Sequence, residues 1–121
     1  MFLRRIEILG FKSFARKTVF EFPDGGETFP ITAIVGPNGS GKSNFADAIR
    51  WAIGEQSTKS LRGKKSEDVI FSGTDKKSRL GVASVSLLFE NRDKRIPLDY
   101  EEVSVTRRLF RDGESEYLIN G

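Results

Sequence analysis

The 121-residue chain contains no cysteine and no histidine. The lack of cysteine excludes a disulfide framework and thiolate metal sites, and the lack of histidine excludes imidazole-based catalytic triads and the usual zinc sites. No apolar run approaches the roughly 18 residues that a membrane-spanning helix needs, and residues 1–5 (MFLRR) lack the long apolar stretch of a signal peptide. We therefore expect a cytoplasmic protein with no membrane partner.

Neither sign of charge is in large excess, because 20 Lys and Arg residues stand against 17 Asp and Glu residues and the formal net charge is +3. The basic residues nevertheless form clusters, which are Arg4/Arg5, Arg16/Lys17, Lys59/Arg62/Lys64/Lys65, Lys76/Lys77/Arg79, Arg92/Lys94/Arg95 and Arg107/Arg108/Arg111. Each cluster has two interpretations, a solvated face or a surface for an anionic partner such as nucleic acid.

The length permits one small domain, and the pattern of apolar residues predicts an α/β fold. Alternation over residues 1–9 and again over 17–22 predicts two strands, the first of them at an edge or half-buried. Residues 10–14 interrupt the pattern and residues 23–26 (PDGG) supply turn chemistry, so we expect the two strands to form a hairpin that opens the domain. Residues 31–35 (ITAIV) are apolar and β-branched, which is typical of a strand buried on both faces.

An amphipathic helix of about three turns is predicted next along the chain. Its apolar residues recur at helical spacing and are Phe45, Ala48, Ile49, Ala52 and Ile53. Gly54 stands where a glycine commonly ends a helix. Trp51 lies off this apolar stripe, so it is either an exposed aromatic platform or, as we favour, a packing residue for a part of the domain outside this chain.

Residues 55–81 are rich in glycine, serine and lysine and are predicted to form a long basic loop. Ser66 is predicted to cap a short helix over residues 67–71, whose acidic residues suit the positive end of the helix dipole. Loops of this length inside a compact domain are usually functional.

Antiparallel strands are predicted within residues 82–121, over 82–89, 103–110 and 117–119, with a hairpin turn at Asp112-Gly113. Asn120-Gly121 are also hairpin-turn residues, with no second strand after them. The buried strand at 31–35 needs parallel neighbours that this sequence does not provide. We therefore expect the chain to be the first part of a larger domain.

The motif with the clearest chemistry is residues 36–43 (GPNGSGKS), which fits the pattern G-x-x-x-x-G-K-[ST] at every fixed position. Glycines let successive backbone N–H groups approach phosphate oxygens, and the start of the following helix adds partial positive charge. The motif assigns Lys42 to the β- and γ-phosphates of a nucleotide and the Ser43 hydroxyl to Mg²⁺. A glycine-rich turn that binds nothing is the alternative, which the flanking strand and helix disfavour.

Hydrolysis of such a nucleotide also needs an acidic Mg²⁺ partner at the end of a second buried strand. The nearest candidate is residues 85–90 (VSLLFE), which we reject because a serine interrupts the apolar run and the strand ends in Glu-Asn. The sequence thus predicts a chain that binds nucleotide phosphates but carries only half of a hydrolysis site. We expect the chain to be inactive by itself.

Beyond this motif, the whole chain resembles the N-terminal head segment of bacterial SMC (structural maintenance of chromosomes) proteins. The stretches that carry the resemblance are residues 10–14 (GFKSF), 36–44 (GPNGSGKSN), 47–51 (DAIRW), 54–57 (GEQS), 61–63 (LRG), 67–73 (EDVIFSG) and 115–121 (SEYLING). The resemblance implies an α/β fold, the N-terminal lobe of an ABC-type P-loop NTPase over residues 1–121. In it, an antiparallel β-hairpin region lies beside the buried strand, P-loop and helix, and the domain is incomplete.

The resemblance also implies an ATPase head that a C-terminal lobe completes across a long coiled coil and hinge. The Walker B acids, the signature motif and the Q-loop glutamine would then lie outside this chain. Two such heads would sandwich two ATP molecules with Mg²⁺ and would bind and organise DNA in chromosome condensation and segregation. A kleisin-type subunit and a nucleoid-associated, cytoplasmic location are implied as well.

Positions that match the family's motifs give the candidate site residues. The phosphates would lie on Asn38, Gly39, Ser40, Gly41, Lys42, Ser43 and Asn44, approached by Lys12 and Ser13 from the first loop. Arg62 would reach toward the phosphates within the same head, so Lys42 and Arg62 are the candidate catalytic residues. Lys64 and Lys65 would contact DNA phosphates, although Lys64 stands where relatives often have glycine. For Lys12, Ser13, Arg62 and Lys65 the alternative is an ordinary solvated loop residue.

Two other functions stay open at this point. The first is a head of a related DNA-repair ATPase of the RecN or RecF type, against which residues 54–57 and 61–63 argue. The second is a stand-alone P-loop kinase or GTPase, against which the N-terminal antiparallel hairpin and the lack of a guanine-reading motif argue.

Overall fold

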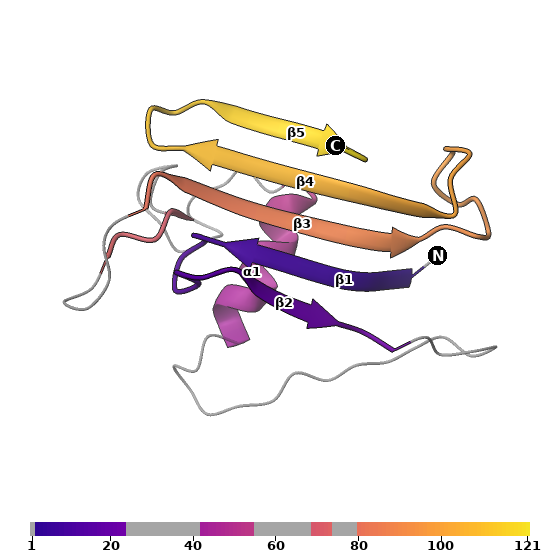
Figure 1. Ribbon diagram of the computed structural model, residues 1–121, viewed down its shortest axis with the longest axis horizontal. Coiled ribbons are helices and arrows are strands. Elements are labelled where there is room, and N and C mark those ends of the chain that lie inside the picture. The colour runs from indigo at the N-terminus through magenta and orange to yellow at the C-terminus, as the bar shows by residue number, and fades with distance from the viewer. Residues whose placement is uncertain (1, 24–41, 55–68, 74–79) are drawn as a thin grey trace.

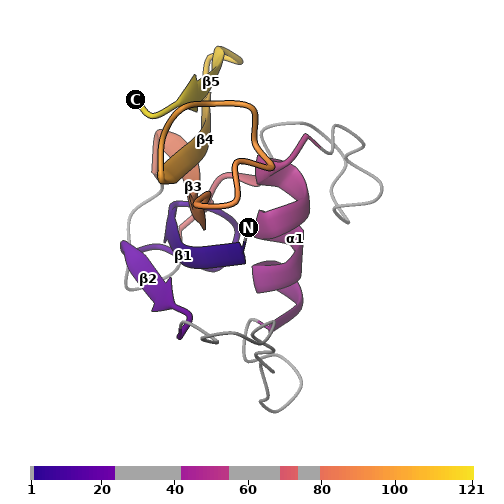
Figure 2. The ribbon, with the colours of Figure 1, turned by 90° about the vertical axis from the view of Figure 1, so that its right-hand side faces the viewer.

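The computed structural model describes residues 2–23, 42–54, 69–73 and 80–121. Its elements are β1 (Phe2–Leu9), β2 (Thr18–Glu21), α1 (Lys42–Ala52), β3 (Val82–Glu90), β4 (Glu102–Phe110) and β5 (Ser115–Ile119). The strands form one antiparallel sheet in the order β2-β1-β3-β4-β5. Figures 1 and 2 show α1 lying against one face of this sheet. The described residues therefore form two layers, a sheet and a helix.

The inner face of the sheet, turned toward α1, is apolar because side chains alternate between the two faces of a strand. Ile6 pairs with Leu87 and Ile8 pairs with Val85, so all four side chains lie on this face. Each is 0% exposed. The apolar side of α1 packs onto them in one core cluster. Burying an aliphatic side chain of this size stabilises a fold by roughly 2 kcal/mol, so the contact between the two layers contributes substantially to stability.

The outer face of the sheet carries polar and charged side chains. The hydroxyls of Ser86 and Thr106, which are paired across β3 and β4, lie 2.7 Å apart. Arg108 Nη1 on β4 lies 3.3 Å from Glu116 Oε2 on β5. The same alternation that makes one face apolar thus makes the other polar, as in sheets that have one solvated face.

The opening hairpin is confirmed, because β1 and β2 pair in antiparallel orientation. The first strand is half-buried as expected, but it does not lie at an edge. β3, from far along the chain, pairs along the free side of β1, so β2 and β5 are the edge strands of the described sheet. Local alternation cannot reveal this insertion, since it records which face is buried and not which strand lies alongside.

The expected helix is confirmed as α1, and Gly54 follows it with a φ of 119°. Ile53 does not belong to the buried stripe, because the helix ends at Ala52 and the Ile53 side chain is 66% exposed. Trp51 is a packing residue, but its partner lies in this chain and not in another part of the domain. Its ring is 5.2 Å from that of Phe11, and only 2% of Trp51 is exposed.

The three later strands are present as β3, β4 and β5, and the turn at Asp112-Gly113 joins β4 to β5. The expected short helix over residues 67–71 is wrong at its end, because Ile70 forms an isolated antiparallel bridge with Phe11. Residues 31–35, 66–68 and most of the basic loop lie outside the described residues.

The β3–β4 loop is organised around the buried side chain of Asn91, which is 0% exposed. Its Nδ2 donates to the carbonyl oxygens of Ile96, Leu98 and Tyr100 at 3.0–3.3 Å, and its Oδ1 accepts from the Ile96 N–H at 3.0 Å. A buried amide is stable only when its donors and acceptors are paired, so this one residue fixes the shape of the loop.

Gly10, directly after β1, provides a test of how closely the backbone at this position approaches the start of β3. It has a φ of 70°, and a Cβ at this position would collide with the carbonyl oxygen of Val82. We expect Gly10→Ala to lower the free energy of unfolding by about 2 kcal/mol or more, because backbone strain and the collision add. Gly113→Ala is the matched control, since Gly113 also has a positive φ but open space around it, and about 1 kcal/mol is expected there. Equal losses in chemical denaturation would contradict the close approach at Gly10.

Candidate functional site

The helix α1 begins within the glycine-rich motif, at its last two residues. The helix begins at Lys42, so Lys42 and Ser43, the last two motif residues, occupy its first positions. Its first turn contains no acidic residue, and Ser43 is exposed. Because the first N–H groups of a helix have no partner within the helix and its dipole is positive at this end, an anion is favoured there. Residues 36–41 lie outside the described residues.

The first loop (residues 10–14) is held in one shape by backbone hydrogen bonds. The Gly10 N–H donates to the carbonyl of Phe14 at 2.6 Å, and the Lys12 N–H donates to the carbonyl of Val69 at 2.6 Å. The Phe71 N–H donates to the Gly10 carbonyl at 2.7 Å. Lys12 has a φ of 49°, which is uncommon for a residue other than glycine. The loop therefore carries Lys12 and Ser13 on a fixed backbone.

Two polar contacts join the first loop to α1. Asn44 Nδ2 donates to Ser13 Oγ at 2.9 Å, and Lys12 Nζ donates to Asp47 Oδ2 at 2.8 Å. Asn44 and Asp47 are three residues apart and so lie on one side of the helix. The structure thus brings Lys12, Ser13 and Asn44 together beside the start of α1, and it adds Asp47, which the sequence analysis missed.

The C-terminal end of α1 is held by Arg107 of β4. Arg107 Nη1 donates to the carbonyl oxygen of Trp51 at 2.8 Å. The guanidinium carbon lies 4.6 Å from the centroid of the Trp51 ring and 5.0 Å from that of the Tyr117 ring, a cation–π arrangement on both. Burial lowers the pKa of the Arg107 guanidinium from its ordinary value, and Tyr117 acts in the opposite direction. A positive charge here also suits the negative end of the helix dipole.

Two of the basic clusters are used within the fold. In the β3–β4 loop the ion pairs are Arg92–Glu90 at 2.9 Å, Arg95–Asp93 at 3.4 Å and Lys94–Asp99 at 3.7 Å. Arg111 donates to the carbonyls of Leu80 at 2.6 Å and Phe71 at 2.9 Å. These contacts favour structural or solvated roles over nucleic-acid binding for both clusters. The clusters at 59–65 and 76–79 lie outside the described residues.

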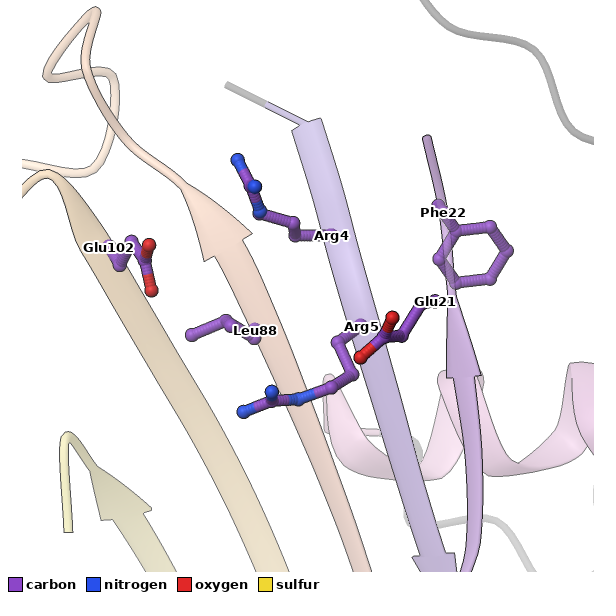
Figure 3. A pocket seen from close by; sticks show the side chains of 6 residues that line it. All are labelled: Arg4, Arg5, Glu21, Phe22, Leu88 and Glu102. Atoms are coloured by element: carbon purple, nitrogen blue, oxygen red, sulfur yellow. The ribbon is translucent and has the colours of Figure 1, made fainter. Parts of the chain in front are cut away.

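A pocket of about 310 Å³ lies on the outer face of the sheet (Figure 3). Its lining consists of Arg4, Arg5, Glu21, Phe22, Leu88 and Glu102. Arg5 pairs with both Glu21 and Leu88, which places these three side chains on the face opposite α1. Because the pocket mixes both signs of charge, it lacks the excess positive potential that phosphates favour. Because the pocket lies on the face opposite α1, it is separate from the candidate phosphate site at the start of that helix.

Glu90, the acid at the end of the stretch that we rejected as a Mg²⁺ partner, forms an ion pair with Arg92. Its Oε1 accepts from Arg92 Nε at 2.9 Å, so at the end of β3 this carboxylate is paired with an arginine of the β3–β4 loop. Among the residues that the structure describes, no three His, Cys, Asp or Glu side chains gather as a metal site would require. Within the same residues, no helix has the length and apolar character needed to cross a membrane.

Comparison with known proteins agrees with this architecture. Residues 2–121 match the model of the RecF/RecN/SMC N terminal domain. The chain belongs to the SMC family. It is 57% identical over 120 residues to the chromosome partition protein Smc of Bacillus subtilis (strain 168) and 59% identical over 120 residues to that of Clostridium kluyveri (strain NBRC 12016). In both cases the match covers 99% of this chain and 10% of the relative, so the chain spans about a tenth of their length.

Solved SMC heads have the same fold. An Smc head bound to the C-winged helix domain of ScpA matches with a TM-score of 0.92 and 40% identity, over 100% of this chain and 36% of that one. A structure from work on ATP-driven dimerization and DNA-stimulated activation of SMC ATPases matches with a TM-score of 0.91 and 40% identity, over 100% and 70%. RecF with ATP, at 24% identity and a TM-score of 0.67 over 98% of this chain and 26% of that one, shares the fold alone. The SMC assignment and the ABC-type N-terminal lobe are thus confirmed.

Several candidate site residues stay predictions, because they lie outside the described residues: Asn38, Gly39, Ser40, Gly41, Arg62, Lys64 and Lys65. The sequence analysis missed Asp47 and Arg107. A signal for Arg107 was present, because it follows Val103 and Val105 in the alternation that marks the inner face. A charged residue in an apolar register indicates a specific partner, and here the partner is the end of α1.

Arg107 and Arg108 are neighbours on β4 that point to opposite faces, which makes a matched pair of variants. We expect Arg107→Met to lower the free energy of unfolding by about 2 kcal/mol, because a charge-assisted hydrogen bond and two cation–π contacts are lost. Arg108→Met breaks only an exposed ion pair, and a loss of about 0.5 kcal/mol is expected. Chemical denaturation of both variants makes the comparison, and equal losses would show that Arg107 does not hold α1.

Proposed function

We propose that this chain is the ATP-binding part of the ATPase head of an SMC protein that organises chromosomal DNA. The observation that carries the proposal is that α1 begins at the last two residues of the glycine-rich motif. The motif ends in Lys42 and Ser43 at the first positions of the helix, and the Ser13–Asn44 hydrogen bond holds the first loop at the next position. A helix start with this motif before it suits a nucleotide phosphate group.

In this proposal the phosphates lie on residues 38–44. Lys42 meets the β- and γ-phosphates as a positive charge, and Lys12 and Ser13 face the nucleotide from the first loop. The exposed Ser43 hydroxyl, on the first turn of α1, is an oxygen donor of the kind that Mg²⁺ prefers. A bound Mg²⁺ would neutralise phosphate charge, and Arg62 would add positive charge from the basic loop.

The proposed assembly extends beyond this chain. The catalytic acids and the signature motif come from a C-terminal lobe and from a second head, so ATP is held between two heads. A kleisin-type subunit binds the complete protein, and ATP-dependent engagement of the heads brings DNA to the surface that Lys64 and Lys65 are predicted to form. The relatives named chromosome partition protein Smc, and the SMC head solved with part of ScpA, support this proposal.

Removal of the Lys42 ammonium tests the nucleotide site. We expect Lys42→Ala in the full-length protein to abolish ATP binding measured by calorimetry, because the charge that meets the β- and γ-phosphates is lost. Lys17→Ala is the control, since Lys17 is exposed and lies 3.9 Å from Glu7 on the outer face. Unchanged ATP affinity of Lys42→Ala would contradict the assignment.

The DNA surface is tested with Lys65→Glu. We expect weaker ATP-dependent DNA binding with nucleotide binding intact, and a slope of log affinity against log salt that falls by about one unit for the lost phosphate contact. Charge reversal adds repulsion, so the loss is largest at low salt, where screening is weakest. Arg62→Ala serves as the comparison and should lower ATP hydrolysis more than DNA affinity. An unchanged salt slope for Lys65→Glu would show that this cluster is a solvated face.

A further inference from the structure

Asp47, in the second turn of α1, is a buried carboxylate with two cationic neighbours. Its side chain is 3% exposed. Oδ2 lies 2.8 Å from Lys12 Nζ, and Oδ1 lies 3.4 Å from Arg50 Nη1. A carboxylate removed from water costs several kcal/mol unless it is paired, so these contacts are a condition for the helix to pack as it does.

The two cations are not equivalent. The Arg50 side chain is 60% exposed and comes from the same helix, three residues away. The Lys12 side chain is 13% exposed and comes from the first loop, 35 residues earlier in the chain. The exposed pair is screened by water and contributes little, whereas the enclosed pair joins two separate segments. Lys12 is therefore the partner that fixes tertiary structure.

The ion pair acts next to a second contact on the same side of the helix. Ser13 follows Lys12 and accepts a hydrogen bond from Asn44, which follows the glycine-rich motif. Consecutive loop residues thus contact helix positions 44 and 47, which are neighbours on the helix surface. An ammonium held on Asp47 fixes the backbone that places Ser13 beside Asn44, in the first turn of α1.

We propose that Asp47 is a positioning residue of the nucleotide site. Its carboxylate holds the Lys12 ammonium, and through it the first loop, against the first two turns of α1 before ATP arrives. The proposal rests on the proposed function. A group fixed in advance binds its ligand more tightly because less freedom is lost on binding.

The test is a double-mutant cycle on ATP affinity in the full-length protein, measured by calorimetry with a non-hydrolysable ATP analogue. Asp47→Asn keeps the shape of the side chain and removes its charge, and Lys12→Met keeps the length of the lysine stem. We expect Asp47→Asn to weaken binding about tenfold, which corresponds to the loss of one charge-assisted hydrogen bond, and Lys12→Met to weaken it at least as much. The double variant should be no weaker than Lys12→Met alone, because Asp47 acts on the nucleotide through Lys12.

Arg50→Met is the matched control, since it removes the other neighbour of Asp47. The affinity of this variant for the ATP analogue should stay within about twofold of that of the parent, because an exposed ion pair contributes little. The thermal midpoint is measured for every variant. The double variant removes both charges of the Lys12–Asp47 pair together, so it keeps the test open if a single variant unfolds.

Three results would overturn the proposal. Asp47→Asn that is destabilised but binds ATP normally would show a structural role only. Asp47→Asn that binds ATP more tightly would show that the carboxylate merely opposes phosphate charge. A double variant about tenfold weaker than Lys12→Met would show that the two residues act independently. The parent and Lys42→Ala are measured in the same experiment. If Lys42→Ala binds ATP like the parent, the proposed nucleotide site is wrong, and this result is distinct from the three above.

Discussion

The helix α1 must bury one side against the sheet while its N-terminal end stays accessible, and the described structure depends on this constraint. The apolar side of α1 covers the inner face of β1 and β3, where Ile6, Ile8, Val85 and Leu87 are fully buried. This packing sets where the helix begins in space. Because the glycine-rich motif ends in the first two residues of α1, Lys42 and Ser43, it also sets where a phosphate group would meet the chain.

Polar contacts add to this packing at both ends of α1. Near the start, the first loop contacts Asn44 and Asp47, and at the far end Arg107 contacts Trp51. Such contacts are directional, whereas apolar burial is not, so they select one placement of the helix among those that the core would tolerate. Among the described residues, several basic side chains are used in this way or in ion pairs of the β3–β4 loop.

The sheet separates two different surfaces. Its inner face supports α1 and the candidate nucleotide site, and its outer face carries ion pairs, hydroxyl pairs and the mixed-charge pocket of Figure 3. Solved SMC heads share this fold at 40% identity. The described residues thus include one part of the proposed nucleotide site, and within them no group of acidic side chains gathers as a metal site would require.

The sequence by itself determined the local features. Alternation marked the strands, helical spacing marked α1, and the motif at residues 36–43 with the flanking stretches identified the family, because these signals depend on neighbours within a few residues. Tertiary structure decided the rest. It placed β3 beside β1, enclosed Trp51 against Phe11, and joined Lys12 to Asp47. These contacts join residues that are tens of positions apart in the sequence. A local pattern does not show which distant residue pairs with a buried charge or which strand pairs with an open strand edge.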